Sequence, residues 1–448
     1  MGSIRSTNGD HNGGGHRLIV GTFNTPELFL LNFNTDKQSL KIESRWEAIG
    51  NHSWLALDKT RKLLLATCWT DPPCIASYRL DALESPKPQA KLVSTQTIKS
   101  RSGYVAVHHH LEGGRGRAYT AGGPSGEVLG LHLETGELTD VLQEMNYITG
   151  ETTLTEQGQR LRGETNGQSS AFQETPHQNG KESENILDFG GLRHGAHSVD
   201  LSPDGRMMYV ADIGRNCVWV HKLDEEGLIT TTQKVISPRP NDGPRHVWPH
   251  PGGKCVYVLQ EHSSMVDVFK VNSAKGTLEW VQGVRIIPED QDEKLFWADE
   301  VRTVPSSAGV PSDEPDLLVA STRGLEKDTK GYVALFKLTS EGLIHVKEKE
   351  DKHAWLDMWQ SPTSGGWANA VEPCYKLLHG PQASFTNQSR RNEGQYMALT
   401  DSEEGLVMIL SIETDTTKQS KHIVEVARVS LGKSNDGKIR GAATAVWL

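Results

Sequence analysis

The sequence lacks the features of several protein classes. Its 448 residues include five cysteines, and no two of them are spaced as C-x-x-C: Cys68, Cys74, Cys217, Cys255 and Cys374. Neither a disulfide framework nor a zinc site is therefore indicated. We expect buried, reduced thiols and a cytoplasmic location. Because no segment approaches the ~20 apolar residues of a membrane helix, we expect no association with membranes.

A stripe of basic residues is also missing. The formal net charge is -10, and Lys and Arg do not cluster with aromatic residues as they do on surfaces that bind phosphate backbones. We therefore expect no nucleic acid as a partner. Three adjacent histidines, His108 to His110, lie on a predicted strand. Because neighbouring strand residues point to opposite faces, these histidines cannot converge on one ion, and we expect no metal or other cofactor.

Two stretches have compositions typical of disorder. Residues 1–16 are rich in glycine and lack the apolar segment of a secretory signal, which predicts a disordered tail. Residues from about 150 to 186 are rich in Gln, Glu, Thr, Asn and Gly with almost no apolar periodicity, which predicts a disordered insertion. Ser384 to Glu393 predicts a shorter polar loop. The remaining chain, from residue 17 to residue 448, is expected to be one domain.

Two segments of the chain repeat each other. Residues 198–210, with Pro203, align with residues 246–258, with Pro251, at an offset of about 48 residues. In each copy an alternating apolar strand leads through a Pro-Asp-Gly or Pro-Gly-Gly turn into a second strand, and two more strands follow. Four short strands in about 45 residues are typical of one β-propeller blade.

Weaker copies of this pattern account for the rest of the domain. They cover residues 18–48, 53–98, 102–147, 296–349 and 366–431, so the sequence predicts an all-β, seven-bladed β-propeller. Residues 442–448 form one more apolar strand without a blade of its own, and we expect it to close the ring against the first blade. The Trp-Asp dipeptide of WD40 scaffolding propellers is absent.

The repeat predicts where functional side chains gather. The start of a blade's first strand and the end of its second strand share one face of a propeller. His197 and Arg245 occupy equivalent first-strand starts, six residues before the aligned prolines, whereas Glu261 and Arg323 follow second strands. Four polar side chains from three consecutive blades thus meet at one mouth of the central channel.

This set of side chains suits a small polyanion. Arginine binds carboxylates through two parallel hydrogen bonds, and a Glu or His side chain can transfer a proton. The alternative is that these residues only satisfy loop backbone groups or form a structural ion pair. Trp297 and Trp367 lie near first-strand starts and could form a wall of the same pocket.

Several segments resemble a known family. They are Gly195 to Ser198, Asp242 to Arg245 with Val256 to Glu261, Ala320 to Arg323, and Ser361 to Gly366 with Ala368 to Val371. They are similar to the fungal 3-carboxy-cis,cis-muconate cyclases, which group with bacterial 6-phosphogluconolactonases among the seven-bladed propeller lactonases. The resemblance runs from about residue 18 to residue 448, apart from the insertion.

The resemblance implies a metal-independent cycloisomerase of aromatic catabolism, in the protocatechuate branch (the β-ketoadipate pathway). It implies that Arg245 and Arg323 bind substrate carboxylates and stabilise the developing charge, and that Glu261 or His197 delivers a proton. Asn369, which lies in a matching segment, joins the expected substrate-binding residues. The expected partner is a small polycarboxylate or a lactone, and a homo-oligomer is possible from the sequence.

The chain departs from the cyclase pattern at two positions. Trp367 stands where the cyclases have a His, and Trp297 stands where they have an Arg. A lost Arg removes a carboxylate partner worth about 1.5 to 3 kcal/mol, so the substrate could be less acidic or more aromatic than carboxymuconate. The alternatives are a lactone hydrolase, a secondary-metabolite isomerase, or a propeller that binds without catalysis.

Overall fold

The computed structural model describes residues 15–84, 87–109, 111–163, 195–305, 310–346, 353–374, 395–415 and 420–448. The predicted tail up to residue 14, residues 164–186 of the predicted insertion and the loop from Ser384 to Glu393 lie outside these ranges. In the described part the chain forms seven antiparallel sheets that follow one another along the sequence.

Each sheet is one blade, and its strands follow one another from the channel outward. Blade 1 consists of β29 (Ala442–Trp447), β1 (Gly15–Thr22), β2 (Glu27–Asn34) and β3 (Ser39–Glu47). Blade 2 consists of β4 (Leu55–Leu57), β5 (Leu63–Cys68), β6 (Cys74–Arg79) and β7 (Lys91–Thr97). Blade 3 consists of β8 (Tyr104–His108), β9 (Arg115–Ala121), β10 (Ser125–His132), β11 (Leu138–Asn146) and β12 (Glu151–Leu154).

The other four blades have four strands each. Blade 4 consists of β13 (Ala196–Leu201), β14 (Met207–Asp212), β15 (Cys217–Leu223) and β16 (Ile229–Ile236). Blade 5 consists of β17 (Pro244–Pro249), β18 (Cys255–Gln260), β19 (Met265–Asn272) and β20 (Thr277–Arg285). Blade 6 consists of β21 (Phe296–Val304), β22 (Leu317–Gly324), β23 (Tyr332–Lys337) and β24 (Trp355–Gln360). Blade 7 consists of β25 (Val371–Pro373), β26 (Gln395–Asp401), β27 (Leu406–Asp415) and β28 (Ser420–Ser430).

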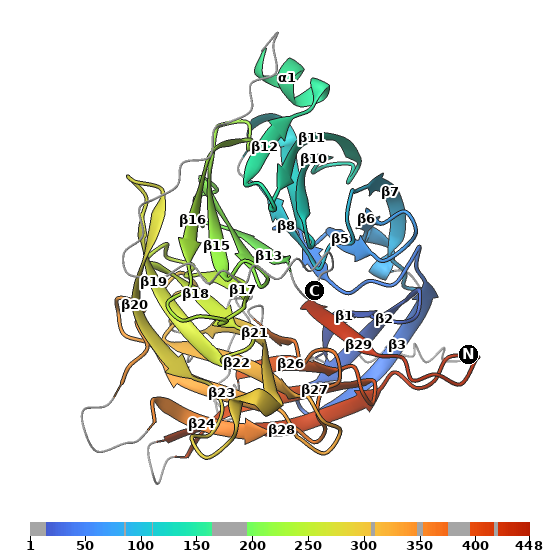
Figure 1. The fold of residues 1–448 in the computed structure, drawn as a ribbon. Helices are drawn as coiled ribbons and strands as arrows, with labels where there is room; N and C mark the ends of the chain where they lie inside the picture. Colours follow the sequence, from blue (N-terminus) through green and yellow to red (C-terminus); the bar gives the residue numbers. More distant parts are fainter. Residues whose placement is uncertain are drawn as a thin grey trace, which may run out of the picture.

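The blades form a ring that the C-terminal strand closes (Figure 1). β29 pairs antiparallel with β1, with Trp447 opposite Leu18 and Val446 opposite Ile19. All residues of β29 are buried. The predictions of a seven-bladed propeller and of closure by residues 442–448 are therefore confirmed.

The apolar core lies between neighbouring blades. One cluster joins blades 1 and 2 through residues such as Leu30 and Leu64, and another joins blades 5 and 6 through Leu259 and Ala320. Each sheet buries both faces against its neighbours, since alternate side chains point to opposite sides. The inner strands are thereby fixed around the channel, and their polar residues can be held there precisely enough to form a site.

Two predicted boundaries were wrong. The start of the expected disordered insertion is ordered: β12 extends blade 3, and helix α1 (Glu156–Arg162) follows it. Thr152 and Leu154 face inward, and the Thr155 hydroxyl caps the helix by accepting from the Gly158 N–H. β12 has only four residues, which are too few for an alternation of buried and exposed positions to be recognised within a polar sequence. In blade 6 the outer strand lies beyond the predicted limit of residue 349, because a longer connection precedes β24.

All five cysteines are buried, as predicted. Within the described ranges, no helix combines the length and the apolar character needed to cross a membrane.

Candidate active site at one mouth of the channel

The site is built on irregularities of three neighbouring inner strands. β13, β17 and β21 each lose register with the next strand at one residue near their start, and these residues are His197, Arg245 and Asp299. A bulge of this kind leaves one residue out of the ladder and turns its side chain. As a result, an imidazole, a guanidinium and a carboxyl group from consecutive blades line the same cavity.

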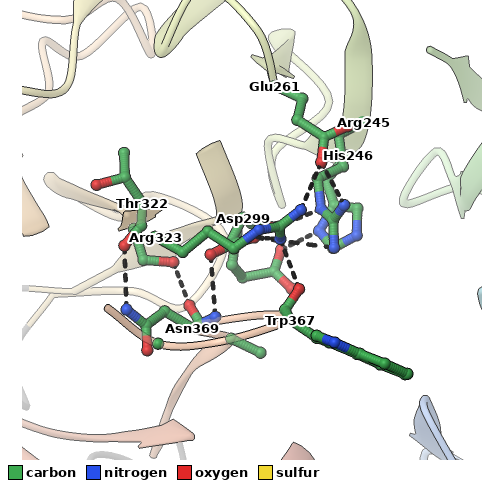
Figure 2. Close-up of polar contacts among 12 residues, drawn as sticks. Arg245, His246, Glu261, Asp299, Thr322, Arg323, Trp367 and Asn369 are labelled. Carbon is green, nitrogen blue, oxygen red and sulfur yellow. Dashed lines mark hydrogen bonds and ion pairs between the residues drawn. The ribbon is translucent and has the colours of Figure 1, made fainter. Parts of the chain in front are cut away.

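Glu261 connects the two predicted arginines. Its Oε1 accepts hydrogen bonds from Arg245 Nη1 at 2.8 Å and from Arg323 Nη2 at 2.9 Å (Figure 2). All three side chains are largely buried. Arg323 lies near the end of β22, and Glu261 directly follows β18. The structure therefore brings Arg245, Glu261 and Arg323 together, as the repeat predicted.

Asp299 is a second carboxyl group of this network. It pairs with Arg323 Nη1, and its Oδ1 lies 3.8 Å from Arg245 Nη2. Its Oδ2 accepts the Asn369 backbone N–H at 3.0 Å. Burial raises the pKa of Asp299, and the charges of Arg323 and Arg245 oppose that shift. Two guanidiniums and two carboxyl groups thus share a buried cluster, which fixes the arginines before any ligand arrives.

The structure places Asn369 behind the cavity wall. Its side-chain amide donates to the Thr322 carbonyl at 3.0 Å, and its side chain is not among those that line the cavity (Figure 2). The prediction that Asn369 contacts the substrate therefore needs correction: Asn369 holds Asp299 and β22 in place. Trp367 also contributes through its backbone, because its carbonyl accepts from Arg323 Nη1 at 2.6 Å.

Aromatic rings form the outer wall of the cavity, which has a volume of about 500 Å³. The Trp297 ring lies 5.1 Å from the Arg323 guanidinium, in the range of a cation–π contact. Phe23 packs against both Trp69 and Trp367, with ring centroids 5.9 and 5.7 Å apart. Trp367 is 62% exposed, so it forms the rim. Trp297 and Trp367 line the pocket as predicted. The rings of Phe23, from blade 1, and Trp69, from blade 2, line it as well.

His197 completes the predicted set without joining the ion-pair network. It is buried, and burial together with the charges of Arg245 and Arg323 lowers the pKa of its imidazole well below the usual value. Its ring is therefore neutral in the unliganded protein near pH 7. The ring centroid lies 5.2 Å from that of His246, the residue after Arg245.

Three residues that line this cavity each have one buried side-chain atom without a hydrogen-bond partner among the described residues. The atoms are His197 Nδ1, His246 Nε2 and Glu261 Oε2. A buried polar atom without a partner costs about 1 to 3 kcal/mol. Their concentration in one cavity indicates a site prepared for a polar ligand.

Sequence reasoning missed Asp299 and His246. A signal for Asp299 was present: it stands six residues before Pro305, the same spacing that selects His197 before Pro203 and Arg245 before Pro251. Near the start of β21, only Trp297, two residues earlier, was considered as a site residue. His246 had no such signal, since a single histidine within an apolar strand is most often a core residue. In the described part of the chain no group of three or more His, Cys, Asp or Glu side chains is arranged to hold a metal ion.

Comparison with known proteins gives a consistent result. Residues 17–353 match the family described as "Lactonase, 7-bladed beta-propeller". The chain is 37% identical over 434 residues to muconate cycloisomerase 1 of Cutaneotrichosporon cutaneum, covering 96% of this chain and 98% of that protein. It is 24% identical to the carboxy-cis,cis-muconate cyclase of Neurospora crassa, over 88% of this chain and 91% of the relative. A solved periplasmic gluconolactonase of Pseudomonas aeruginosa has the same fold, with a TM-score of 0.63 at 17% identity over 97% of this chain and 99% of that one.

Proposed function

Because the chain belongs to the lactonase family of seven-bladed β-propellers, we propose that it is a cycloisomerase that converts an open-chain unsaturated polycarboxylate, 3-carboxy-cis,cis-muconate or a close relative, to its lactone. The observation that carries this proposal is the pair of arginines bridged by one carboxylate in a cavity, in a chain 37% identical to a muconate cycloisomerase over almost its whole length. The pathway is then the breakdown of aromatic compounds.

In this reaction one substrate carboxylate adds to a carbon–carbon double bond. The new C–O bond forms at one carbon, the π electrons move to the neighbouring carbon, and that carbon takes a proton. The tricarboxylate loses one negative charge, so each turnover consumes one proton from solvent. Nothing leaves the substrate, and no oxidant or reductant is needed.

Arg245 and Arg323 are assigned to the substrate carboxylates. Their cationic groups face the cavity and stabilise the negative charge that grows on the carboxylate next to the reacting carbon. Their position is fixed by Glu261 and Asp299, so little reorganisation is needed when the substrate binds. The proton transfer is assigned to Glu261 and His197, because both residues line the cavity and each has a buried side-chain atom without a hydrogen-bond partner among the described residues.

The aromatic wall favours one variation on this proposal. Trp297 and Trp367, with Phe23 and Trp69, give the outer cavity an apolar surface that a small polyanion does not need. A muconate that carries a bulky or aromatic substituent, as in secondary metabolism, would use it. Hydrolysis of a lactone in the same cavity is the second candidate, consistent with the family description. A cytoplasmic location and a homo-oligomer stay predictions from the sequence.

The test is a direct assay. We expect the protein to remove the ultraviolet absorbance of the conjugated diene when mixed with 3-carboxy-cis,cis-muconate or an aryl-substituted muconate. A panel of lactones, followed by acid release, measures hydrolysis in parallel. Acid release without loss of the diene would make the protein a lactone hydrolase, and activity on neither panel would contradict both proposals.

A further inference from the structure

His246 occupies the inner end of the mouth cavity and has a carboxylate partner. It lies on β17, is 3% exposed, and lines the cavity next to His197. Its Nδ1 is 2.9 Å from Glu300 Oε1, on the neighbouring strand β21. Its Nε2 is buried and has no hydrogen-bond partner among the described residues. This is the arrangement of a histidine that is oriented through one nitrogen and works through the other.

The hydrogen bonds around Glu300 define the protonation of the imidazole. Oε1 of Glu300 also accepts the Val301 N–H at 3.0 Å and an N–H of Arg302. Both of these groups only donate, so this oxygen acts as an acceptor and His246 Nδ1 is the donor to it. In the neutral imidazole Nε2 is then unprotonated and carries a free lone pair. Burial raises the pKa of Glu300 to about 7 against the charge of Arg302. At pH 7.5 its carboxylate form would stabilise a proton added at Nε2.

Burial, together with the charges of three arginines, keeps His246 neutral in the unliganded protein. Burial lowers the pKa of His246 well below the usual value, and Arg245, Arg302 and Arg323 lower it further. An anionic ligand bound to Arg245 and Arg323 would offset two of these three charges, which favours the imidazolium. The titratable and charged groups facing His246 from the packed strands are Arg245, His197, Glu300, Arg302, Arg323 and Tyr104.

We propose that His246 and Glu300 form a proton-loading pair: binding of a polycarboxylate causes His246 to take up a proton at Nε2, and His246 passes it by way of His197 to the reacting carbon. The proton comes from solvent and ends in a new C–H bond, which matches the one proton that each cyclisation consumes. Glu300 acts through His246 and is a positioning residue. The reaction step rests on the proposed function, whereas the proton uptake requires only an anionic ligand.

Calorimetry of ligand binding tests the uptake directly. Tricarballylate, a saturated tricarboxylate that cannot cyclise, is titrated at pH 7.5 in two buffers of different ionisation enthalpy. We expect uptake of close to one proton by the parent protein and little or none by His246→Gln. Absence of uptake in the parent, with or without detectable binding, would overturn the proposal, and so would unchanged uptake in His246→Gln.

His221→Gln is the matched control. His221 is also buried, its Nδ1 bonds Thr232 Oγ1 at 2.8 Å, and its Nε2 likewise has no partner among the described residues. His221 lies on β15 and lines neither half of the channel. We expect this variant to take up as many protons as the parent, which separates a role in the cavity from the general effect of losing a buried histidine.

Glu300→Gln separates charge from orientation. Its amide oxygen can still accept the His246 N–H, but the negative charge that supports the imidazolium is gone. We expect kcat to fall about 100-fold in His246→Gln with KM within a few-fold, and the high-pH decline of kcat to move to lower pH in Glu300→Gln. If the parent is active and both variants keep its kcat and its pH profile, the proton-loading pair is excluded. The cycloisomerase proposal would then remain intact.

Discussion

The two halves of the channel hold similar charges but differ in how those charges are satisfied. The mouth cavity contains Arg245, Arg323, Glu261 and Asp299. The opposite half is a cavity of about 490 Å³ lined by Asp200, Glu300, Arg302 and Glu372, among others. Trp54, Ala370 and Thr444 line both halves and form the boundary between them. By volume and charge alone, the two ends would be equal candidates for a site.

Their hydrogen bonds distinguish them. In the far half, Arg302 pairs with Glu300 and with Glu372 at 3.1 Å, and Asp200 accepts the Tyr104 hydroxyl at 2.8 Å. No described residue lining the far half has a buried side-chain atom without a partner, whereas three residues of the mouth have one. A satisfied ion cluster holds strands together, and unsatisfied atoms indicate a ligand. Charge density alone is therefore a poor guide to function in this ring.

The largest expected effect comes from removing the strand that both halves share. β29 carries Thr444, which lines both cavities, and Trp447, whose Nε1 donates to the Glu372 carbonyl at 2.9 Å. Deleting residues 442–448 exposes the edge of β1 and several buried apolar side chains, each worth about 1.5 to 3 kcal/mol. We expect the deletion to abolish cooperative melting, or to lower Tm sharply, in a circular-dichroism melt. A control without Leu448 alone should melt within a few degrees of the parent. An unchanged melt of the longer deletion would contradict closure by β29.

Substitutions at the mouth should separate into two kinetic classes. Glu261→Gln and His197→Asn remove proton transfer, so we expect kcat to fall roughly 100-fold or more with little change in KM. Arg245→Lys and Arg323→Lys keep the charge but lose the paired N–H donors, so we expect KM to rise and kcat/KM to fall about 10- to 100-fold. Steady-state rates of diene loss measure both.

Two outcomes would refute the assignment of the mouth. All four variants should remain folded, which a thermal melt checks alongside each rate. Every variant could keep a rate near the parent value on each muconate and lactone that the parent accepts. That result would mean that the mouth is a structural ion cluster like the far half. Loss of activity in the presence of a chelator would contradict a metal-independent reaction.

The sequence allowed the fold and part of the site to be predicted, for physical reasons. The propeller repeats its turns, so Pro203 and Pro251 were enough to define a blade, and the same offset located His197 and Arg245. The bulges that turn these side chains into the cavity leave no mark in the pattern of apolar residues. Asp299 was missed, although it stands at the same offset before Pro305 as His197 before Pro203.

Asn369 illustrates a different limit of sequence reasoning. The sequence segment around it matched a family pattern, yet its side chain bonds the Thr322 carbonyl rather than facing the cavity. His246 shows the opposite case, because its role depends on Glu300, which is 54 residues away in the chain. Partners of this kind are set by the stacking of blades and cannot be inferred from either residue alone.

The smallest effect we predict is a change in stability, from Asp200→Asn in the far half. Burial raises the pKa of Asp200 from its ordinary value of 3.8 to about 7. Between these pH values the folded protein keeps a proton that the unfolded chain has lost, so the parent loses stability as the pH rises through this range, and the penalty is complete above pH 7. Asparagine carries no charge and can still accept the Tyr104 hydroxyl. We expect the variant to gain stability relative to the parent between pH 5 and pH 8, by on the order of 1 kcal/mol, in urea denaturation. Its kcat should stay close to that of the parent, because Asp200 neither lines the mouth nor hydrogen-bonds His246, unlike Glu300. If the stability of the variant and of the parent changed with pH in parallel, the buried protonated carboxyl would be refuted. A large loss of kcat would show that Asp200, and not only Glu300, takes part in the reaction.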